Sequence, residues 1–358
     1  MVNRVKIYFL FVLISIAVFS CRKDTPPSLP QQQGSITTGK RLLICDEGGF
    51  RNNNASISIY DPSSNSTIIN AYAASNSNQS LGDVLQSVTK FNDKYYLVVN
   101  NSGKIVVCDK NFVRLTTISG FISPRYMQVV SNNKAYVSNL ILPANINPNQ
   151  TNYIQVLDLA TNRISKSIRV DGWTEEMVQS YGKVYITNQN KKYVYVIDAL
   201  NDNLDSIYVG ATNACIVKDA NEKLWVSCNA DAASNLSAKL KRIDPVSNTV
   251  DTTIISLQTT QNSISHLCIN GDGTTLYYLM NDVYKMGIND TVCPTAGIIT
   301  QGTHTFYGLC IDPDDETIYI SDALDYNSNG KLYRYQANAI FIGTYTMGII
   351  PGFMFMDN

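Results

Sequence analysis

A strand pattern recurs along most of this 358-residue chain with a period of about 45 residues. Each unit has a short apolar run that stops at Asn or Asp, followed by a second run of the form apolar-x-apolar-Asp and by turn residues. Six of the units also have a third apolar element upstream. The run that stops at Asn or Asp occurs seven times, as RLLICD, YYLVVN, AYVSN, VYITN, LWVSCN, LYYLMN and IYISD. Seven units of about four short strands predict a β-propeller.

The two ends of the repeat region are out of phase with each other. The region begins at Arg41 with the second strand of a unit, and residues 353–357 form an isolated first strand. We therefore expect the C-terminal strand to pair with residues 41–46, which closes the ring and removes an exposed sheet edge. Two β-sandwiches are the alternative, but they explain neither the single period nor the divided unit. The expected fold is all-β, a seven-bladed β-propeller with four-stranded blades.

Composition agrees with an all-β fold and excludes several functions. Asp and Glu total 29, of which only five are Glu, and Asp favours turns whereas Glu favours helices. A net charge of −1 excludes a broad electrostatic contact with nucleic acid. With two histidines in the chain, a multi-histidine metal site is not expected. We expect no cofactor and no metal.

The first 40 residues have the composition of an export signal and a linker. Arg4 and Lys6 precede an apolar run over residues 7–20, which is shorter than the roughly 20 residues that span a bilayer. The run ends at Cys21, a pattern that resembles a bacterial lipoprotein signal, with an ordinary secretory signal as the alternative. We expect a signal peptide over 1–20, a flexible tether over 21–40 starting at a lipidated Cys21, and the propeller over 41–358. The lipid anchor is then the only membrane contact, with the domain at the outer membrane and exposed on the cell surface.

The remaining seven cysteines match no metal-binding spacing. Most of them lie inside apolar strand-like runs such as KIVVCD and YGLCID. We expect buried free thiols, with a single disulfide as the alternative.

One face of the predicted propeller carries the long loops, over residues 48–55, 140–153, 229–238 and 323–330. Long loops on a rigid scaffold commonly hold binding sites. The loops on this face also gather aromatic, Arg and acidic side chains, which suit a bulky polar ligand. In the alternative, Tyr126, Trp173 and Tyr307 only fill space between blades. The candidate ligand-binding residues are Phe50, Arg51, Arg125, Tyr126, Trp173, Glu176, Tyr307, Asp325 and Tyr326.

No catalytic motif is evident in the sequence. His266 is expected to point into a blade interface, and His304 lies in a loop without a nucleophile beside it. Glu175 and Glu176 are neighbours in a predicted strand, so they should face opposite ways. Glu176 could still meet Asp325 in space. We therefore expect a protein that is not an enzyme and assign no catalytic residue.

The strings AYVSN, VYITN and IYISD, followed by strands of the VIDALND type, resemble the YVTN-type propeller family. The longer strings SPRYMQVVSNNKAYVSN, GWTEEM, FYGLCIDP and YNSNGKLYRY, together with the signal, resemble outer-membrane surface lipoproteins with seven-bladed propellers. The resemblance implies capture of a small-molecule nutrient, a corrinoid such as vitamin B12, and its transfer to a TonB-dependent outer-membrane transporter. A protein–protein scaffold at the outer membrane and a glycan-active lyase or hydrolase are the alternatives.

Overall fold

The computed structural model describes residues 39–141, 151–251, 255–257 and 262–358. The chain divides into two units, residues 1–33 and 34–358, and every described residue belongs to the second. The predicted signal peptide, Cys21 and nearly all of the tether lie outside the described residues, as does most of the predicted loop 140–153. No described helix reaches the length and apolar character that crossing a bilayer requires.

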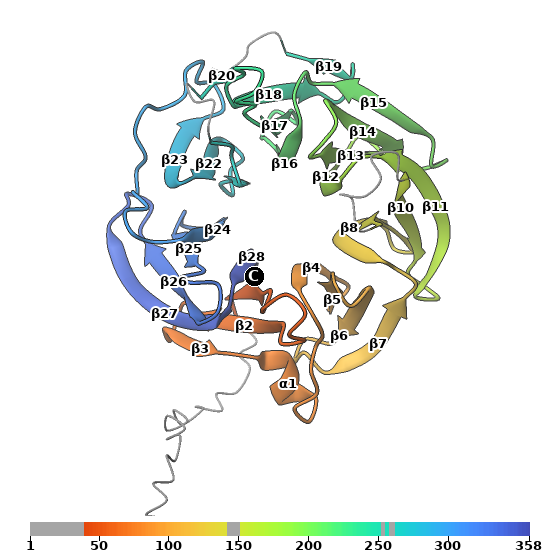
Figure 1. Cartoon of the computed structure of the whole chain (residues 1–358), viewed down its shortest axis with the longest axis vertical. Helices are drawn as coiled ribbons and strands as arrows, with labels where there is room; N and C mark the ends of the chain where they lie inside the picture. The colour runs from red at the N-terminus through yellow and green to blue at the C-terminus, as the bar shows by residue number, and fades with distance from the viewer. Residues whose placement is uncertain (1–38, 142–150, 252–254, 258–261) are drawn as a thin grey trace, which may run out of the picture. The chain divides into compact units, whose positions relative to one another are not determined.

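The second unit consists of seven antiparallel sheets arranged around a central axis, as Figure 1 shows. The predicted seven-bladed propeller is therefore confirmed. In order from the axis outward, the first four blades are β28 (Pro351–Asp357), β1 (Arg41–Asp46), β2 (Ser56–Asp61) and β3 (Ser66–Ile68); β4 (Leu85–Phe91), β5 (Lys94–Val99), β6 (Lys104–Cys108) and β7 (Arg114–Ser119); β8 (Ser123–Ser131), β9 (Lys134–Leu140), β10 (Thr151–Asp158) and β11 (Arg163–Asp171); and β12 (Thr174–Ser180), β13 (Lys183–Asn188), β14 (Tyr193–Asp198) and β15 (Leu204–Tyr208).

The last three blades follow the same plan with small departures. They are β16 (Asn213–Lys218), β17 (Leu224–Cys228), β18 (Lys239–Asp244) and β19 (Thr249–Val250), with β20 (Ile255–Ser256) also paired to β18; β21 (His266–Ile269), β22 (Thr275–Met280) and β23 (Asp282–Gly287); and β24 (Phe306–Ile311), β25 (Ile318–Asp322), β26 (Asn329–Tyr335) and β27 (Phe341–Ile349). In the sixth blade the outer position is filled by a segment that pairs at one bridge, Val283 with Ile299. One short helix, α1 (Ala71–Ser75), follows β3.

The ring closes as the sequence predicts. Strand β28 is antiparallel to β1, with Arg41 opposite Asp357 and Ile44 opposite Met354. The innermost strand of the first blade thus comes from the far end of the repeat region. This pairing covers the inner edge of β1, which would otherwise be exposed.

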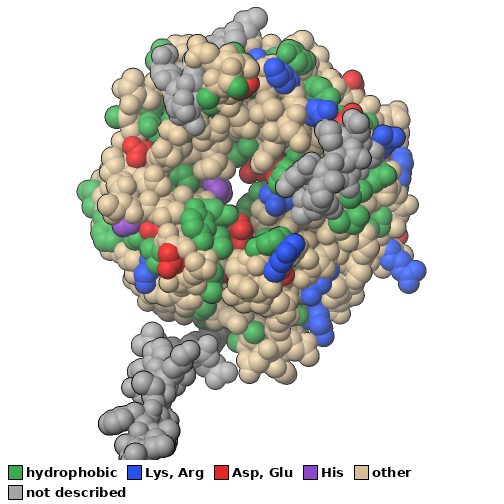
Figure 2. Space-filling view, viewed as in Figure 1, with side chains coloured by type: hydrophobic (Ala, Val, Ile, Leu, Met, Phe, Trp, Pro, Cys, Tyr) green, Lys and Arg blue, Asp and Glu red, His purple; other side chains and the backbone are tan. Residues whose placement is uncertain are grey.

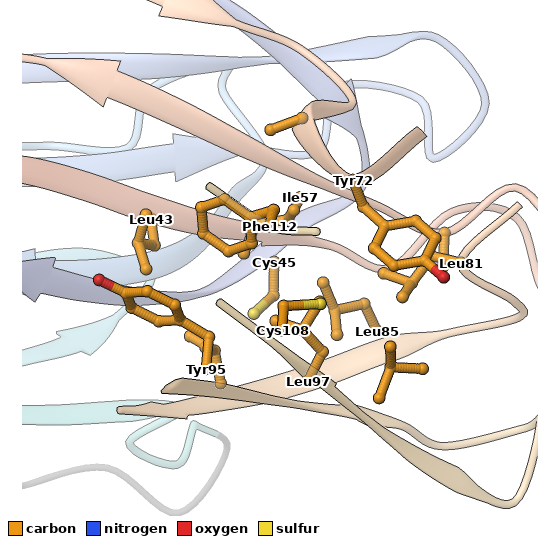
Figure 3. Close-up of a cluster of buried hydrophobic side chains, with 14 of the residues drawn as sticks. Leu43, Cys45, Ile57, Tyr72, Leu81, Leu85, Tyr95, Leu97, Cys108 and Phe112 are labelled. Carbon is orange, nitrogen blue, oxygen red and sulfur yellow. The ribbon is translucent and has the colours of Figure 1, made fainter. Parts of the chain in front are cut away.

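The core lies between neighbouring blades, because the middle strands are apolar on both faces. Figure 3 shows one such interface, where Leu43 and Ile57 of the first blade meet Leu97 and Cys108 of the second. These side chains are almost fully buried. Each contributes about 1.5–3 kcal/mol of transfer free energy, and seven repetitions of this interface hold the ring together.

The Asn and Asp residues that end the second strands mainly bind nearby backbone. The Asn139 side chain accepts hydrogen bonds from the amides of Ile122 and Ser123. Asn188 donates to the carbonyl of Asp171 and accepts from the amide of Lys191. These bonds fix the loops that lead into the innermost strands. Their role is local, as expected for Asn at a strand end.

All seven cysteines of the described residues are free thiols, six of them buried and Cys268 half-buried. The prediction of buried free thiols is confirmed, and the alternative of a disulfide among them is wrong.

Candidate functional site

A cavity of about 520 Å³ lies where the innermost strands begin. Residues from the start of all seven innermost strands line it, from β28 and β4 round to β24. In the view down the axis, Figure 2 shows an opening at the centre of the ring, with hydrophobic, acidic, basic and histidine side chains around it. Its volume is in the range of pockets for small organic ligands.

β-Bulges build the wall of this cavity. Six of the seven innermost strands change register near their start, so that extra residues face the neighbouring strand. A bulge turns side chains out of the regular alternation, and bulges are common beside functional sites. The bulged residues all line the cavity: Gln86, Arg125, Tyr126, Glu175, Glu176, Ala214, Cys215, Tyr307, Gly352 and Phe353.

Hydroxyl side chains on the second strands hold the bulges in place. Ser138 accepts from the amide of Tyr126 at 3.0 Å, and Ser227 accepts from the amide of Cys215 at 2.9 Å. Thr187 donates to the carbonyl of Ala214 at 2.8 Å. Each of these hydroxyl residues immediately precedes the residue that ends the strand or lies one position further upstream. In these three blades a Ser or Thr near the end of the second strand is the sequence feature that accompanies a bulge.

Arg125, the only Lys or Arg in the described lining, forms an ion pair with Glu175. The Arg125 guanidinium binds the Glu175 carboxylate through Nε at 3.0 Å from Oε2 and through a terminal nitrogen at 2.8 Å from Oε1. Glu175 is 2% exposed and also accepts a hydrogen bond from the Trp173 indole nitrogen. The guanidinium lies 5.6 Å from the centre of the Trp173 ring. These three residues form one rigid unit in which the two charges cancel.

Glu176, the next residue in the chain, differs from Glu175 in its protonation state. Burial raises the pKa of Glu176 to about 8, and the nearby Glu175 carboxylate adds to the rise, against a hydrogen bond from the Ile216 amide at 3.1 Å. At neutral pH this side chain is therefore a carboxylic acid that can donate a proton. Glu175 and Glu176 turn toward opposite neighbours, as the strand alternation predicts, with Glu175 bound to Arg125 of the third blade and Glu176 to the Ile216 amide of the fifth, and both line the cavity.

Two further titratable groups complete the lining. Burial lowers the pKa of His266 to about 4, so its imidazole is neutral at physiological pH. Burial also raises the pKa of Glu47, despite a hydrogen bond from the Tyr307 hydroxyl at 3.1 Å. His266 lines the cavity, opposite Leu279 of the neighbouring strand β22. Neither His266 nor Glu47 is among the predicted site residues, because nothing in their local sequence marks them.

Six of the nine predicted site residues line the cavity: Phe50, Arg125, Tyr126, Trp173, Glu176 and Tyr307. Arg51, Asp325 and Tyr326 do not belong to the lining. The Arg51 guanidinium lies 5.2 Å from the centre of the Phe50 ring. Asp325 accepts hydrogen bonds from Ser328 in its own turn, away from Glu176.

Tyr326 lies at the rim of the cavity, beside the lining residue Tyr307. Its ring meets the edge of the Tyr307 ring at 5.8 Å between centroids, and 47% of Tyr326 is exposed. Phe50, at the mouth of the cavity, is 58% exposed. The predicted residues therefore fall into a cavity group and a rim group.

Solved structures of other propellers resemble this fold. A quinonprotein alcohol dehydrogenase-like protein from Bacteroides thetaiotaomicron has a TM-score of 0.69 and 13% identity, over 91% of this chain and 80% of that one. The periplasmic gluconolactonase of Pseudomonas aeruginosa has a TM-score of 0.64 and 9% identity, over 89% and 99%. A Bacteroides fragilis protein provisionally described as a 6-phosphogluconolactonase has a TM-score of 0.62 and 10% identity, over 91% and 100%. At such identities these likenesses concern the fold.

The expectation that the chain is not an enzyme is overturned by these neighbours, which include propellers described as lactonases. That expectation depended on the lack of a catalytic motif in the sequence. In a propeller, however, the groups of one cavity come from separate blades, as Glu47, Glu176 and His266 do here. A contiguous motif is therefore not required, and both a binding role and an enzymatic role are compatible with the fold.

No curated protein matches the sequence. The sequence model of the family described as Domain of unknown function (DUF5074) matches residues 40–347, nearly the whole propeller. The chain therefore belongs to the DUF5074 family.

Proposed function

We propose that this protein is a hydrolase that opens a cyclic ester of the sugar-lactone type in its central cavity. The observation that carries the proposal is Glu176, a cavity carboxyl with a pKa of about 8 beside the ion-paired Glu175. Neighbouring carboxyl groups that hold different protonation states are typical of acid–base sites. The propellers described as lactonases add support from the same fold.

The proposed chemistry uses two groups of the cavity. The neutral His266 imidazole takes a proton from a water molecule as that water attacks the ester carbonyl carbon. The ring carbon–oxygen bond then breaks, and the Glu176 carboxylic acid gives its proton to the departing ring oxygen. The product is the open-chain hydroxy acid, and exchange with solvent returns a proton to Glu176 and removes one from His266.

Glucono-1,5-lactone is the first substrate to test. Its product ionises at neutral pH, so a pH indicator follows the release of protons above the spontaneous rate. We expect Glu176→Gln, which keeps the shape but cannot donate the proton, to lower kcat/KM by roughly 100-fold or more. Glu222→Gln is the matched control, because Glu222 is exposed and pairs with Lys218 away from the cavity.

Two results would reject the proposal. The first is wild-type turnover no faster than buffer across a panel of sugar lactones. The second is a Glu176→Gln variant that is folded and as active as Glu222→Gln.

The exposed aromatic side chains of the rim support a second candidate, the capture of a bulky polar ligand. Phe50 and Tyr326 are about half exposed on the same face as the cavity mouth. The resemblance in the sequence suggests a corrinoid, held at the cell surface by a lipid on Cys21 and passed to a TonB-dependent transporter. Gel filtration with cyanocobalamin tests this candidate, since co-elution of red colour at micromolar concentration supports it and its absence rejects it.

A further inference from the structure

We infer that the central cavity accepts an uncharged, polyhydroxylated substrate and rejects the phosphorylated form of the same molecule. This inference rests on the proposed function and names its substrate class. It comes from the charges of the cavity wall.

The described lining offers an anion no unpaired positive charge. Arg125 is the only Lys or Arg in the described lining, and its contacts through Nε and one terminal nitrogen all go to the Glu175 carboxylate. Proteins that recognise phosphate commonly present an Arg fork to it. Here a buried carboxylate already neutralises the guanidinium through Nε and one terminal nitrogen, so a phosphate would have to compete with Glu175 for this charge.

The described lining does not supply a replacement cation. The undescribed stretches 142–150, 252–254 and 258–261 contain no Lys or Arg. Arg51, at the rim, lies against the Phe50 ring and outside the lining. The other acidic and histidine groups of the described wall are Glu47, the uncharged Glu176 and the neutral His266, and none of them carries a positive charge. An incoming phosphate would therefore meet no cation except the paired Arg125.

The same wall suits a neutral molecule rich in hydroxyl groups. Trp173, Tyr126 and Phe353 supply flat apolar surface for the carbon–hydrogen face of a sugar ring. Gln86 and Gln189 supply amide donors and acceptors for hydroxyl groups. Because both kinds of contact are uncharged, affinity should not depend on ionic strength.

The kinetic test compares glucono-1,5-lactone with 6-phosphogluconolactone on the wild-type protein. We expect kcat/KM for the phosphorylated lactone to be lower by about 100-fold, the scale expected when a charge must be desolvated without a partner. Equal efficiency, or a preference for the phosphorylated lactone, overturns the inference. If neither lactone is hydrolysed, the proposed function is wrong. The preference for an uncharged ligand is then tested by binding measurements alone.

The binding test uses sorbitol and sorbitol 6-phosphate, which carry no ester to hydrolyse, with saturation-transfer NMR on the wild-type protein. Binding of sorbitol alone supports the inference. Binding of sorbitol 6-phosphate equal to or tighter than sorbitol overturns it, and so does binding of neither.

Glu175→Gln provides a gain-of-function test, because it removes the carboxylate that occupies Arg125. We expect this variant to bind sorbitol 6-phosphate at least tenfold more tightly than wild type, while Glu222→Gln does not change. A Glu175→Gln variant that folds and shows no gain overturns the assignment of Glu175 as the group that excludes phosphate. If that variant does not fold, the kinetic and binding comparisons on the wild-type protein still test whether the cavity rejects phosphate.

Discussion

Asp357 and Arg41 form a buried ion pair across the seam that closes the ring. The Arg41 Nε atom lies 2.9 Å from Asp357 Oδ2, and the two side chains are 4% and 5% exposed. Tyr95, in the second blade, donates a hydrogen bond to the same carboxylate and accepts one from Arg41. One network therefore joins β28, β1 and β5, which are far apart in the sequence and adjacent in the fold.

Removing the acid of this pair should weaken the seam. Asp357→Ala leaves the Arg41 charge buried without its carboxylate, and we expect the free energy of unfolding to fall by about 3–5 kcal/mol. Urea denaturation at pH 7 measures the change. Asp314→Ala is the control, because Asp314 pairs with Lys40 at the surface with 64% of its side chain exposed, and such pairs contribute about 0–1 kcal/mol. Equal losses in the two variants would contradict the importance of the seam.

A second buried carboxyl should make stability depend on pH. Burial raises the pKa of Asp46 to about 7, against hydrogen bonds from Ser58, Ser56 and the Gly348 amide. The folded state holds this proton more tightly than the unfolded chain does, so protonated Asp46 contributes fully to the free energy of unfolding below pH 4. This stabilisation, on the order of 4 kcal/mol, is lost as pH rises through 7.

Asp46→Asn isolates this contribution, because the amide stays neutral at every pH. We expect the stability of the wild type relative to the variant to decrease between pH 5 and pH 8.5 in urea denaturation. A difference that does not change with pH would show that Asp46 ionises in the folded protein at its ordinary pKa.

The activity proposed here should have an alkaline limit. Because Glu176 donates a proton in the proposed reaction and its pKa is about 8, kcat should decrease as pH rises through 8. Initial rates between pH 6 and 10, corrected for spontaneous hydrolysis, test this. An activity that increases through pH 8 would instead assign Glu176 the role of a base.

The bulges should depend on their hydroxyl partners. Thr187→Val keeps the volume of the side chain but removes its hydrogen bond to the carbonyl of Ala214, which lines the cavity. We expect a loss of about 1–3 kcal/mol in unfolding free energy and a larger loss of turnover than stability alone explains. Thr161→Val, in an exposed turn, is the control. Unchanged turnover in a stable Thr187→Val variant would contradict the view that the bulge positions the site.

The ring could be predicted from the sequence because its determinants are local and repeated. Seven strand-ending Asn or Asp residues set the period, and the divided unit at residues 41–46 and 353–357 fixes the closure. Arg125, Tyr126 and Trp173 were found because aromatic and charged residues stand out in loops that enter the innermost strands.

The chemistry of the cavity could not be predicted in the same way. Strand alternation correctly places Glu175 and Glu176 toward opposite neighbouring blades, but it does not show that the bulge at these residues brings both of them to the cavity wall. His266 and Glu47 join the site only because separate blades converge on the axis. Likewise, no local sequence pattern indicates that Arg125 forms an ion pair with Glu175.

The most direct test of this account is the protonation state of Glu176. The chain has only five glutamates, so a protein labelled with carbon-13 at the Glu carboxyl carbon gives five resonances that Glu→Gln variants assign. Hydrogen bonds from Tyr277 and Asn270 lower the pKa of Glu316 to about 2, which provides an internal reference. We predict that the Glu176 resonance titrates near pH 8. Titration near the ordinary value of 4.3 would contradict it, because the cavity would then hold no carboxylic acid at neutral pH.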